Sequence, residues 1–326
     1  MGRDAGPDVR VTAATLATTT ASEDAALRGL LTHLSGAGYA FVTPTPSTVS
    51  LVRDRCDARD EDILRDAFGW TRRFRAEQID AALFRDLEQA GLVVGEGDCW
   101  RSTVRVSSVD ANLFVHTAPT DAGDAVFLGP DTYRYARLLR HVLDGAQYGS
   151  ALDLGTGAGV GALTLAAMKP GSRVLASDVN PKALRYTRLN AEAAGLNVET
   201  WLCDGIPPSP SSFDLIVANP PYIAGDGGRT YRDGGDQLGA ALALGWLRAG
   251  LARLNRGGRF VLYTGSAIVS GQDFIRTESI RLADAHGCSL DYEEIDPDVF
   301  GSTLRQRAYA TVDRIAAIGA VFTAPA

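Results

Sequence analysis

The chain has 326 residues, 45% of them hydrophobic and 22% charged, and its formal net charge at pH 7 is -7. These values are typical of a globular protein with one α/β domain and a smaller one, and the acidic balance argues against broad electrostatic binding of nucleic acid. No apolar run reaches the roughly 18 residues of a membrane span, and the N-terminus lacks the apolar core of a secretion signal. We therefore expect a cytoplasmic protein with no membrane partner.

The cysteine pattern favours neither a metal site nor a disulfide framework. Cys56, Cys99, Cys203 and Cys288 form no CxxC pair and have no nearby histidine.

The N-terminal third predicts a flexible leader over residues 1–20 and a small domain over residues 21–120. Helices are predicted at 22–36, capped by Ser22, at 60–68 and at 76–90, followed by a hairpin of strands 92–94 and 100–106. Three helices and a hairpin are the order of a winged helix, and Arg72, Arg73 and Arg75 could then meet a DNA phosphate. Thirteen arginines face seventeen acidic residues over 1–120, however, so we favour a separately folding module for substrate recognition or dimerisation.

From residue 121 to 326 strands and helices alternate, which indicates a mostly parallel sheet of seven strands with helices on both faces. Strands are predicted at 150–154, 173–178, 198–203, 213–218, 259–263, 289–295 and 306–313. Helices are predicted at 160–168, 181–194 and 237–254.

A glycine-rich turn joins the first of these strands to its helix, with Asp153, Gly155, Thr156, Gly157 and Gly159 in sequence. Glycine lets a cofactor approach the backbone more closely than a Cβ would allow. The turn alone does not distinguish between nucleotide cofactors.

Acidic residues end the next two strands. Asp178, followed by Val179, is placed to accept both hydroxyls of a ribose, although a role in capping the next helix is an alternative. Asp204, followed by Gly205, is placed to accept an adenine amino group, although Asp-Gly is also a common turn.

The fourth strand runs into Asn219, Pro220, Pro221 and Tyr222. Two prolines fix the backbone, so the Asn219 side chain and the Pro220 carbonyl are held as two acceptors that can orient an NH2 group. The Tyr222 ring can pack against a planar substrate. The alternative is a rigid turn with no catalytic role.

In this order the motifs resemble the class I S-adenosylmethionine-dependent methyltransferases that modify adenine N6, guanine N2 or protein glutamine N5. The resemblance covers residues 127–313 and implies a Rossmann-like domain that binds S-adenosyl-L-methionine through the glycine turn, Asp178, Val179, Asp204, Gly205 and Asn219. Residues 127–132 and 233–239 are similar to two segments of the glutamine methyltransferases that act on release factors, with departures at Leu128 and Gly129.

The implied reaction is methyl transfer to an amide or exocyclic amine nitrogen, with Asn219, Pro220 and Tyr222 as the catalytic residues and a protein glutamine or nucleic-acid base as the acceptor. Two alternatives stay open. One is a small-molecule methyltransferase of secondary metabolism, in which the winged helix would form a homodimer and cover the pocket. The other is a non-catalytic cofactor-binding regulator whose winged helix binds DNA.

Overall fold

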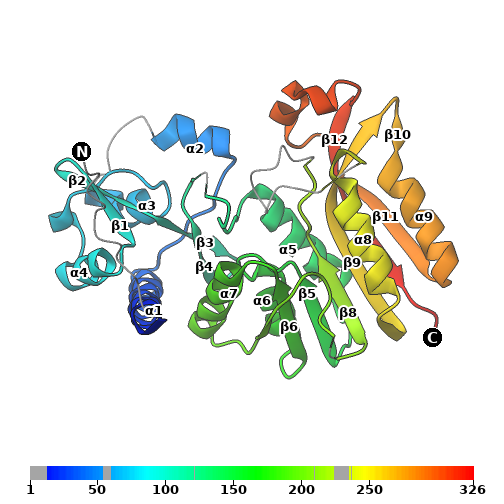
Figure 1. The fold of residues 1–326 in the computed structure, drawn as a ribbon, viewed down its shortest axis with the longest axis horizontal. Coiled ribbons are helices and arrows are strands. Elements are labelled where there is room, and N and C mark those ends of the chain that lie inside the picture. Colours follow the sequence, from blue (N-terminus) through cyan, green and yellow to red (C-terminus); the bar gives the residue numbers. More distant parts are fainter. Residues whose placement is uncertain (1–12, 54–59, 121, 209, 224–234, 236) are drawn as a thin grey trace, which may run out of the picture.

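A computed structural model describes residues 13–53, 60–120, 122–208, 210–223, 235 and 237–326, with only the backbone described at 13–20, 53 and 60. Residues 1–12 of the leader, Cys56, and residues 233, 234 and 236 of the 233–239 segment lie outside the described residues. The N-terminal part lies at one end of the long axis and the sheet of the C-terminal part at the other (Figure 1). No described helix is long and apolar enough to cross a bilayer.

The central sheet has eight strands in the order β11-β12-β9-β8-β5-β6-β7, with β10 paired to β9. Strands β5 to β9 pair in parallel, whereas β12 runs antiparallel to both β9 and β11. The strands are β5 (Ser150–Leu154), β6 (Arg173–Asp178), β7 (Glu199–Leu202), β8 (Phe213–Ala218), β9 (Leu254–Val269), β10 (Gln272–Asp273), β11 (Ser289–Asp296) and β12 (Arg314–Thr323). The prediction of a mostly parallel sheet is confirmed.

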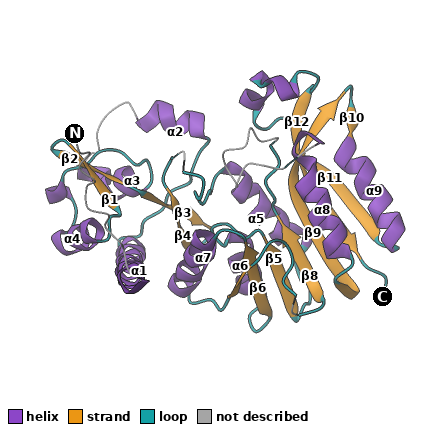
Figure 2. Cartoon of the chain, in the orientation of Figure 1, coloured by secondary structure: helices purple, strands orange, loops and turns teal. Residues whose placement is uncertain are grey.

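Helices cover both faces of this sheet (Figure 2). The apolar side chains of α5 and α6 form one cluster with Ala151, and those of α8 and α9 form another with Leu152. Neighbouring residues of β5 thus point to opposite faces, as the pleat of a strand requires. The helices are α5 (Pro130–Val142), α6 (Val160–Met168), α7 (Pro181–Ala194), α8 (Ala240–Leu251), preceded by η3 (Gln237–Gly239), and α9 (Phe274–His286).

The last strand was predicted in the wrong place. Residues 306–313 contain a turn and the short helix η5 (Arg307–Tyr309), and η4 (Gly301–Arg305) precedes them. The strand is the apolar run that follows, β12, which lies between β9 and β11 and is buried along most of its length. A strand buried on both faces shows no alternation of polar and apolar residues, so β12 lacks the pattern that marks a half-buried strand.

The N-terminal part contains helices and two hairpins. Its elements are α1 (Ala13–Gly36), α2 (Pro46–Arg53), η1 (Asp60–Asp62), α3 (Ile63–Phe68), η2 (Ala76–Gln78), α4 (Ala81–Gln89), β1 (Val93–Glu96), β2 (Cys99–Ser102), β3 (Val104–Val109) and β4 (Asn112–Thr117). Asp80 caps α4 by accepting from the amides of Ala82 and Leu83 at 3.1 and 2.9 Å. The three predicted helices and the hairpin β1-β2 follow in the expected order, but helix α2 and the hairpin β3-β4 were not predicted, and the winged-helix assignment stays a prediction.

Three further details of this part differ from expectation. The first helix begins at Ala13, so the leader over 1–20 is wrong from that residue onward. The strand predicted at 100–106 is broken at Thr103, whose amide donates to the Leu92 carbonyl, and its halves join separate hairpins. Arg72 is buried in an ion pair of 2.7 Å with Asp66, so it is unavailable to a DNA phosphate.

Candidate functional site

A cavity of about 830 Å³ opens at the carboxyl ends of β5, β6 and β8, where open α/β sheets bind their ligands. Its size lies within the usual range for small-molecule sites. The predicted site residues that line it are Asp153, Gly155, Thr156, Gly157, Asp178, Val179, Asp204, Gly205, Asn219, Pro220 and Tyr222. Gly159 does not line the cavity, and a Cβ there would lie 2.9 Å from Cγ2 of Thr187, so this glycine serves packing.

Asp153 holds the glycine turn in place. Its carboxylate accepts from Oγ1 of Thr156 at 2.6 Å, from the amide of Ala162 at 2.9 Å and from the Tyr135 hydroxyl at 3.0 Å. Burial raises the pKa of Asp153 to about 6. Most of the hydrogen-bonding capacity of these oxygens is therefore satisfied within the protein. The negative charge of Asp153 lies in the cavity wall.

Gly157 lies at the open side of the turn. Its φ is +56°, and a Cβ built there would meet no atom within 4 Å, so the backbone faces free space. Gly155 is different, because a Cβ there would lie 2.4 Å from the ring of Trp246 on α8. The turn therefore exposes its backbone on one side and packs tightly on the other.

Asp178 ends β6 inside the cavity. Its carboxylate accepts from the amides of Gly157 and Asn180, each at 2.9 Å, and burial raises its pKa. The cap of α7 is Asn180, whose side chain accepts from the amide of Lys182 at 3.0 Å. Capping this helix thus does not account for Asp178. Because a carboxylate can accept about four hydrogen bonds, this group retains capacity for a ligand.

Asn219, Pro220, Pro221 and Tyr222 line the same cavity from the end of β8. Tyr222 is only 9% exposed, and its ring lies so close to β9 that a Cβ at Gly265 would be 2.3 Å from it. The Phe300 ring meets it edge-on, with centroids 5.5 Å apart. The Tyr222 ring is therefore a packed part of the wall and not a free platform, because β9 and Phe300 already contact it.

Several cavity residues were not among the predicted site residues. Asp131, Thr132 and Tyr135 come from α5, Trp246 comes from α8, and Phe300 comes from the segment before η4. Phe300 has a φ of +56°, which is rare for a bulky side chain and marks local strain of a kind that clusters at functional sites. Asp131 was visible only as part of the similar segment 127–132, and nothing in the spacing of Trp246 or Phe300 indicated the cavity.

The electrostatics of the cavity favour a cation. Asp131, Asp153, Asp178 and Asp204 line it, and no lysine or arginine does so among the residues that the structure describes. Burial raises the pKa of Asp131, while the neighbouring hydroxyl of Tyr263, which donates to it at 2.9 Å, acts in the opposite direction. The described residues hold no group of three or more His, Cys, Asp or Glu side chains suited to a metal ion.

Part of the chain is similar to known methyltransferases. Residues 124–262 match the methyltransferase small domain family. A release factor glutamine methyltransferase from Cereibacter sphaeroides is 37% identical over 135 residues, which are 37% of this chain and 48% of the relative. A ribosomal RNA small subunit methyltransferase C from Pseudomonas putida is 44% identical over 90 residues, 28% of this chain and 27% of the relative. The chain thus spans less than half the length of these relatives.

Among solved structures, a T. thermophilus 16S rRNA N2 guanine methyltransferase in complex with AdoMet and guanosine is 19% identical. It has a TM-score of 0.46 and covers 74% of this chain and 61% of that chain.

The residues present fit an S-adenosylmethionine molecule. Open space beside the Cα of Gly157, an available carboxylate at Asp178 and an anionic wall match an adenosyl group bonded to a positive sulfur. Sheet order, cavity and sequence match agree: residues 124–262 match the methyltransferase small domain family, and the cavity lies at the carboxyl edge of a mostly parallel sheet.

Proposed function

We propose that this protein is an S-adenosylmethionine-dependent methyltransferase that acts on an amide or exocyclic amine nitrogen. The observation that carries the proposal is that Asn219 and Pro220 line the same cavity as Gly157 and Asp178. An acceptor group held at Asn219 would therefore share the cavity with the cofactor.

The chain's own residues would mainly align the two reactants. S-adenosylmethionine supplies a methyl group that its positive sulfur already activates. The Asn219 side-chain oxygen and the Pro220 carbonyl would accept hydrogen bonds from an NH2 group and hold its nitrogen in position. These bonds strengthen as positive charge develops on that nitrogen, so they favour the transition state over the bound substrate.

We propose a macromolecular acceptor, either a protein glutamine or a nucleic-acid base. Support comes from the two relatives described above, which are named for a release factor and for ribosomal RNA. An acceptor of this kind would place the enzyme in the cytoplasm. The N-terminal part would recognise the acceptor, since the cavity lining runs from Ala125 to Phe300 and includes no described residue before Ala125. A homodimer and a small-molecule acceptor stay alternatives.

Labelled cofactor identifies the acceptor class. The wild-type protein and Asn219→Ala are incubated with tritiated S-adenosylmethionine and with separated protein, RNA and small-molecule fractions of a cell extract. The proposal expects label in the protein or RNA fraction with the wild type and little with the variant. Label confined to small molecules would favour the second alternative. Binding of the cofactor with no transfer to any fraction would favour a regulator.

A further inference from the structure

Asn190 joins three parts of the molecule that are distant in sequence. It lies on α7 and is completely buried. Its side-chain oxygen accepts from the Val115 amide at 2.8 Å, and its side-chain nitrogen donates to the Val115 carbonyl at 3.2 Å and to the Ala158 carbonyl at 2.9 Å. One amide side chain therefore contacts β4 of the N-terminal part and the glycine turn that lines the cavity.

The contact with β4 has the form of a strand pairing. β4 belongs to a two-stranded sheet, so one of its edges has no neighbouring strand. At Val115 the Asn190 side chain bonds both the amide and the carbonyl, as a residue of an adjacent strand would. An apolar side chain at position 190 would leave these backbone groups and the Ala158 carbonyl buried without this partner.

Other contacts link the same regions. Thr187, one turn before Asn190 on α7, donates from Oγ1 to the Gly157 carbonyl at 3.2 Å. Thr117, at the end of β4, pairs with Val126 of the cavity wall: its amide donates to the Val126 carbonyl at 3.0 Å, and its Oγ1 accepts from the Val126 amide at 2.9 Å. The hairpin β3-β4 is thus bonded toward the cavity at two points.

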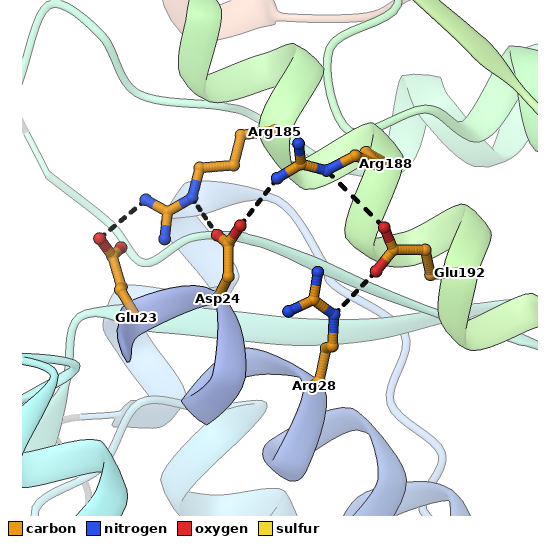
Figure 3. Close-up of polar contacts among 6 residues, drawn as sticks. All are labelled: Glu23, Asp24, Arg28, Arg185, Arg188 and Glu192. Carbon is orange, nitrogen blue, oxygen red and sulfur yellow. Dashed lines mark hydrogen bonds and ion pairs between the residues drawn. The ribbon is translucent and has the colours of Figure 1, made fainter. Parts of the chain in front are cut away.

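A second set of contacts at this junction is ionic and avoids the turn. Figure 3 shows Glu23, Asp24 and Arg28 of α1 facing Arg185, Arg188 and Glu192 of α7. Arg185 bonds Glu23 at 2.7 Å and also pairs with Asp24, and Arg188 bonds Asp24 at 2.7 Å. Arg188 pairs with Asp24 of α1 and with Glu192 of its own helix, so it provides a matched control at the same junction.

We infer that Asn190 is a positioning residue that couples the N-terminal part to the cofactor turn. Binding of S-adenosylmethionine to the turn stabilises the Ala158 backbone, and Asn190 passes this constraint to β4. Coupling between sites is reciprocal, so a partner that orders the N-terminal part raises cofactor affinity by the same factor. The inference rests on the proposed function, because it takes S-adenosylmethionine as the ligand of the turn.

Hydrogen exchange and calorimetry test this coupling in the full-length protein. S-adenosylmethionine is added to the wild type, to Asn190→Ala and to Arg188→Ala, and exchange is followed in the amides of residues 112–117. We expect the cofactor to slow exchange there in the wild type and in Arg188→Ala but not in Asn190→Ala. The dissociation constant should rise by roughly fivefold or more in Asn190→Ala alone.

Each outcome bears on one claim. Cofactor binding without slower exchange in β4 of the wild type would overturn the coupling, and this measurement decides even if Asn190→Ala does not fold. Equal loss of affinity in Arg188→Ala would show a general effect of a weakened junction and would also overturn it. Failure of the wild type to bind S-adenosylmethionine would instead contradict the proposed function.

Discussion

Two aspartates that the sequence places together at the cofactor have different surroundings. Asp153 bonds to Thr156, Ala162 and Tyr135, whereas Asp178 accepts from two backbone amides and keeps capacity for a ligand. The turn and both aspartates were predictable, because their residue types and spacing follow the strands. The difference between their hydrogen-bond partners was not predictable, because Tyr135 lies on α5, a helix that was not predicted.

Replacing Asp178 tests the cofactor site. Asp178→Ala should weaken S-adenosylmethionine binding by about 1.5–3 kcal/mol, the range for a lost hydrogen bond to a charged group. Titration calorimetry measures this directly. Asp214→Ala is the control, because Asp214 accepts from Gly149 and Ser150 at the other end of β5 and should affect stability alone. Unchanged affinity in folded Asp178→Ala, or tight NADH binding by the wild type, would contradict the assignment.

The pH dependence of binding tests the anionic wall. Burial raises the pKa of Asp153 to about 6 and also raises the pKa of Asp178. The Asp153 carboxyl becomes more negative as pH rises from 5 to 7, which favours a positive ligand. S-adenosylhomocysteine lacks the sulfur-bound methyl group and its positive charge but is otherwise identical, so the pH dependence of the ratio of the two affinities isolates this effect. We expect the preference for S-adenosylmethionine to rise by roughly three- to tenfold over this interval. An affinity ratio that stays constant with pH would show that the charge of the cavity wall does not affect binding of the positive sulfur.

Asn219 tests the role of the NPPY turn in catalysis. Asn219→Ala should lower kcat by about 100- to 1000-fold, the range for removing one group that stabilises a transition state, with a much smaller change in KM. Cofactor affinity should change little. Steady-state kinetics on the acceptor found by labelling measure the first effect, and calorimetry measures the second. Wild-type turnover in this variant would show that the motif is only a rigid turn.

At the scale of elements, helices with strong signals were well predicted. The predicted helices at 160–168 and 181–194 coincide with α6 and α7, because glycine, proline and Asn180 mark where they begin. Helices α5 and α9 were not predicted, and β9 is longer than expected. The hairpin β3-β4 was also missed, because its strands are buried along much of their length and show little alternation of buried and exposed residues.

The packing between elements changes what Tyr222 is expected to do. The Tyr222 ring packs between Gly265 of β9 and Phe300. Tyr222→Ala therefore removes a packed side chain from the protein and not only a surface for substrate stacking. We expect a loss of about 3–5 kcal/mol in the free energy of unfolding, measured by urea denaturation, as for other buried aromatic truncations. Tyr222→Phe is the control and should retain most of the stability. Wild-type stability in Tyr222→Ala, with weaker acceptor binding, would restore the stacking role.

At the scale of the whole molecule, the sheet of the C-terminal part could be predicted and the junction with the N-terminal part could not. One hydrophobic cluster contains Leu27 of α1 and Leu87 of α4 together with Leu163 of α6 and Leu189 of α7. Composition and periodicity show that each helix has an apolar face but not which face it meets. This shared core argues against the separate folding expected for residues 21–120.

Truncation tests the shared core. A chain that begins at Ala122 would expose the α6 and α7 side chains of this cluster, including Leu189, and would lose the ion pairs of Arg185. We expect it to have a lower melting temperature than the full chain or to aggregate, as large exposed apolar patches promote. Thermal unfolding and size-exclusion chromatography measure this. A monomeric truncation with the full chain's stability and cofactor affinity would show that the two parts fold independently.

The chemical identity of the methylated atom tests the central claim most directly. After transfer from S-adenosylmethionine with a deuterated methyl group, fragmentation by mass spectrometry locates the label on the acceptor. A label on an amide or exocyclic amine nitrogen is the predicted result, because Asn219 and Pro220 present two acceptors suited to an NH2 group. A label on oxygen or carbon would contradict the nitrogen assignment and leave the methyltransferase fold in place.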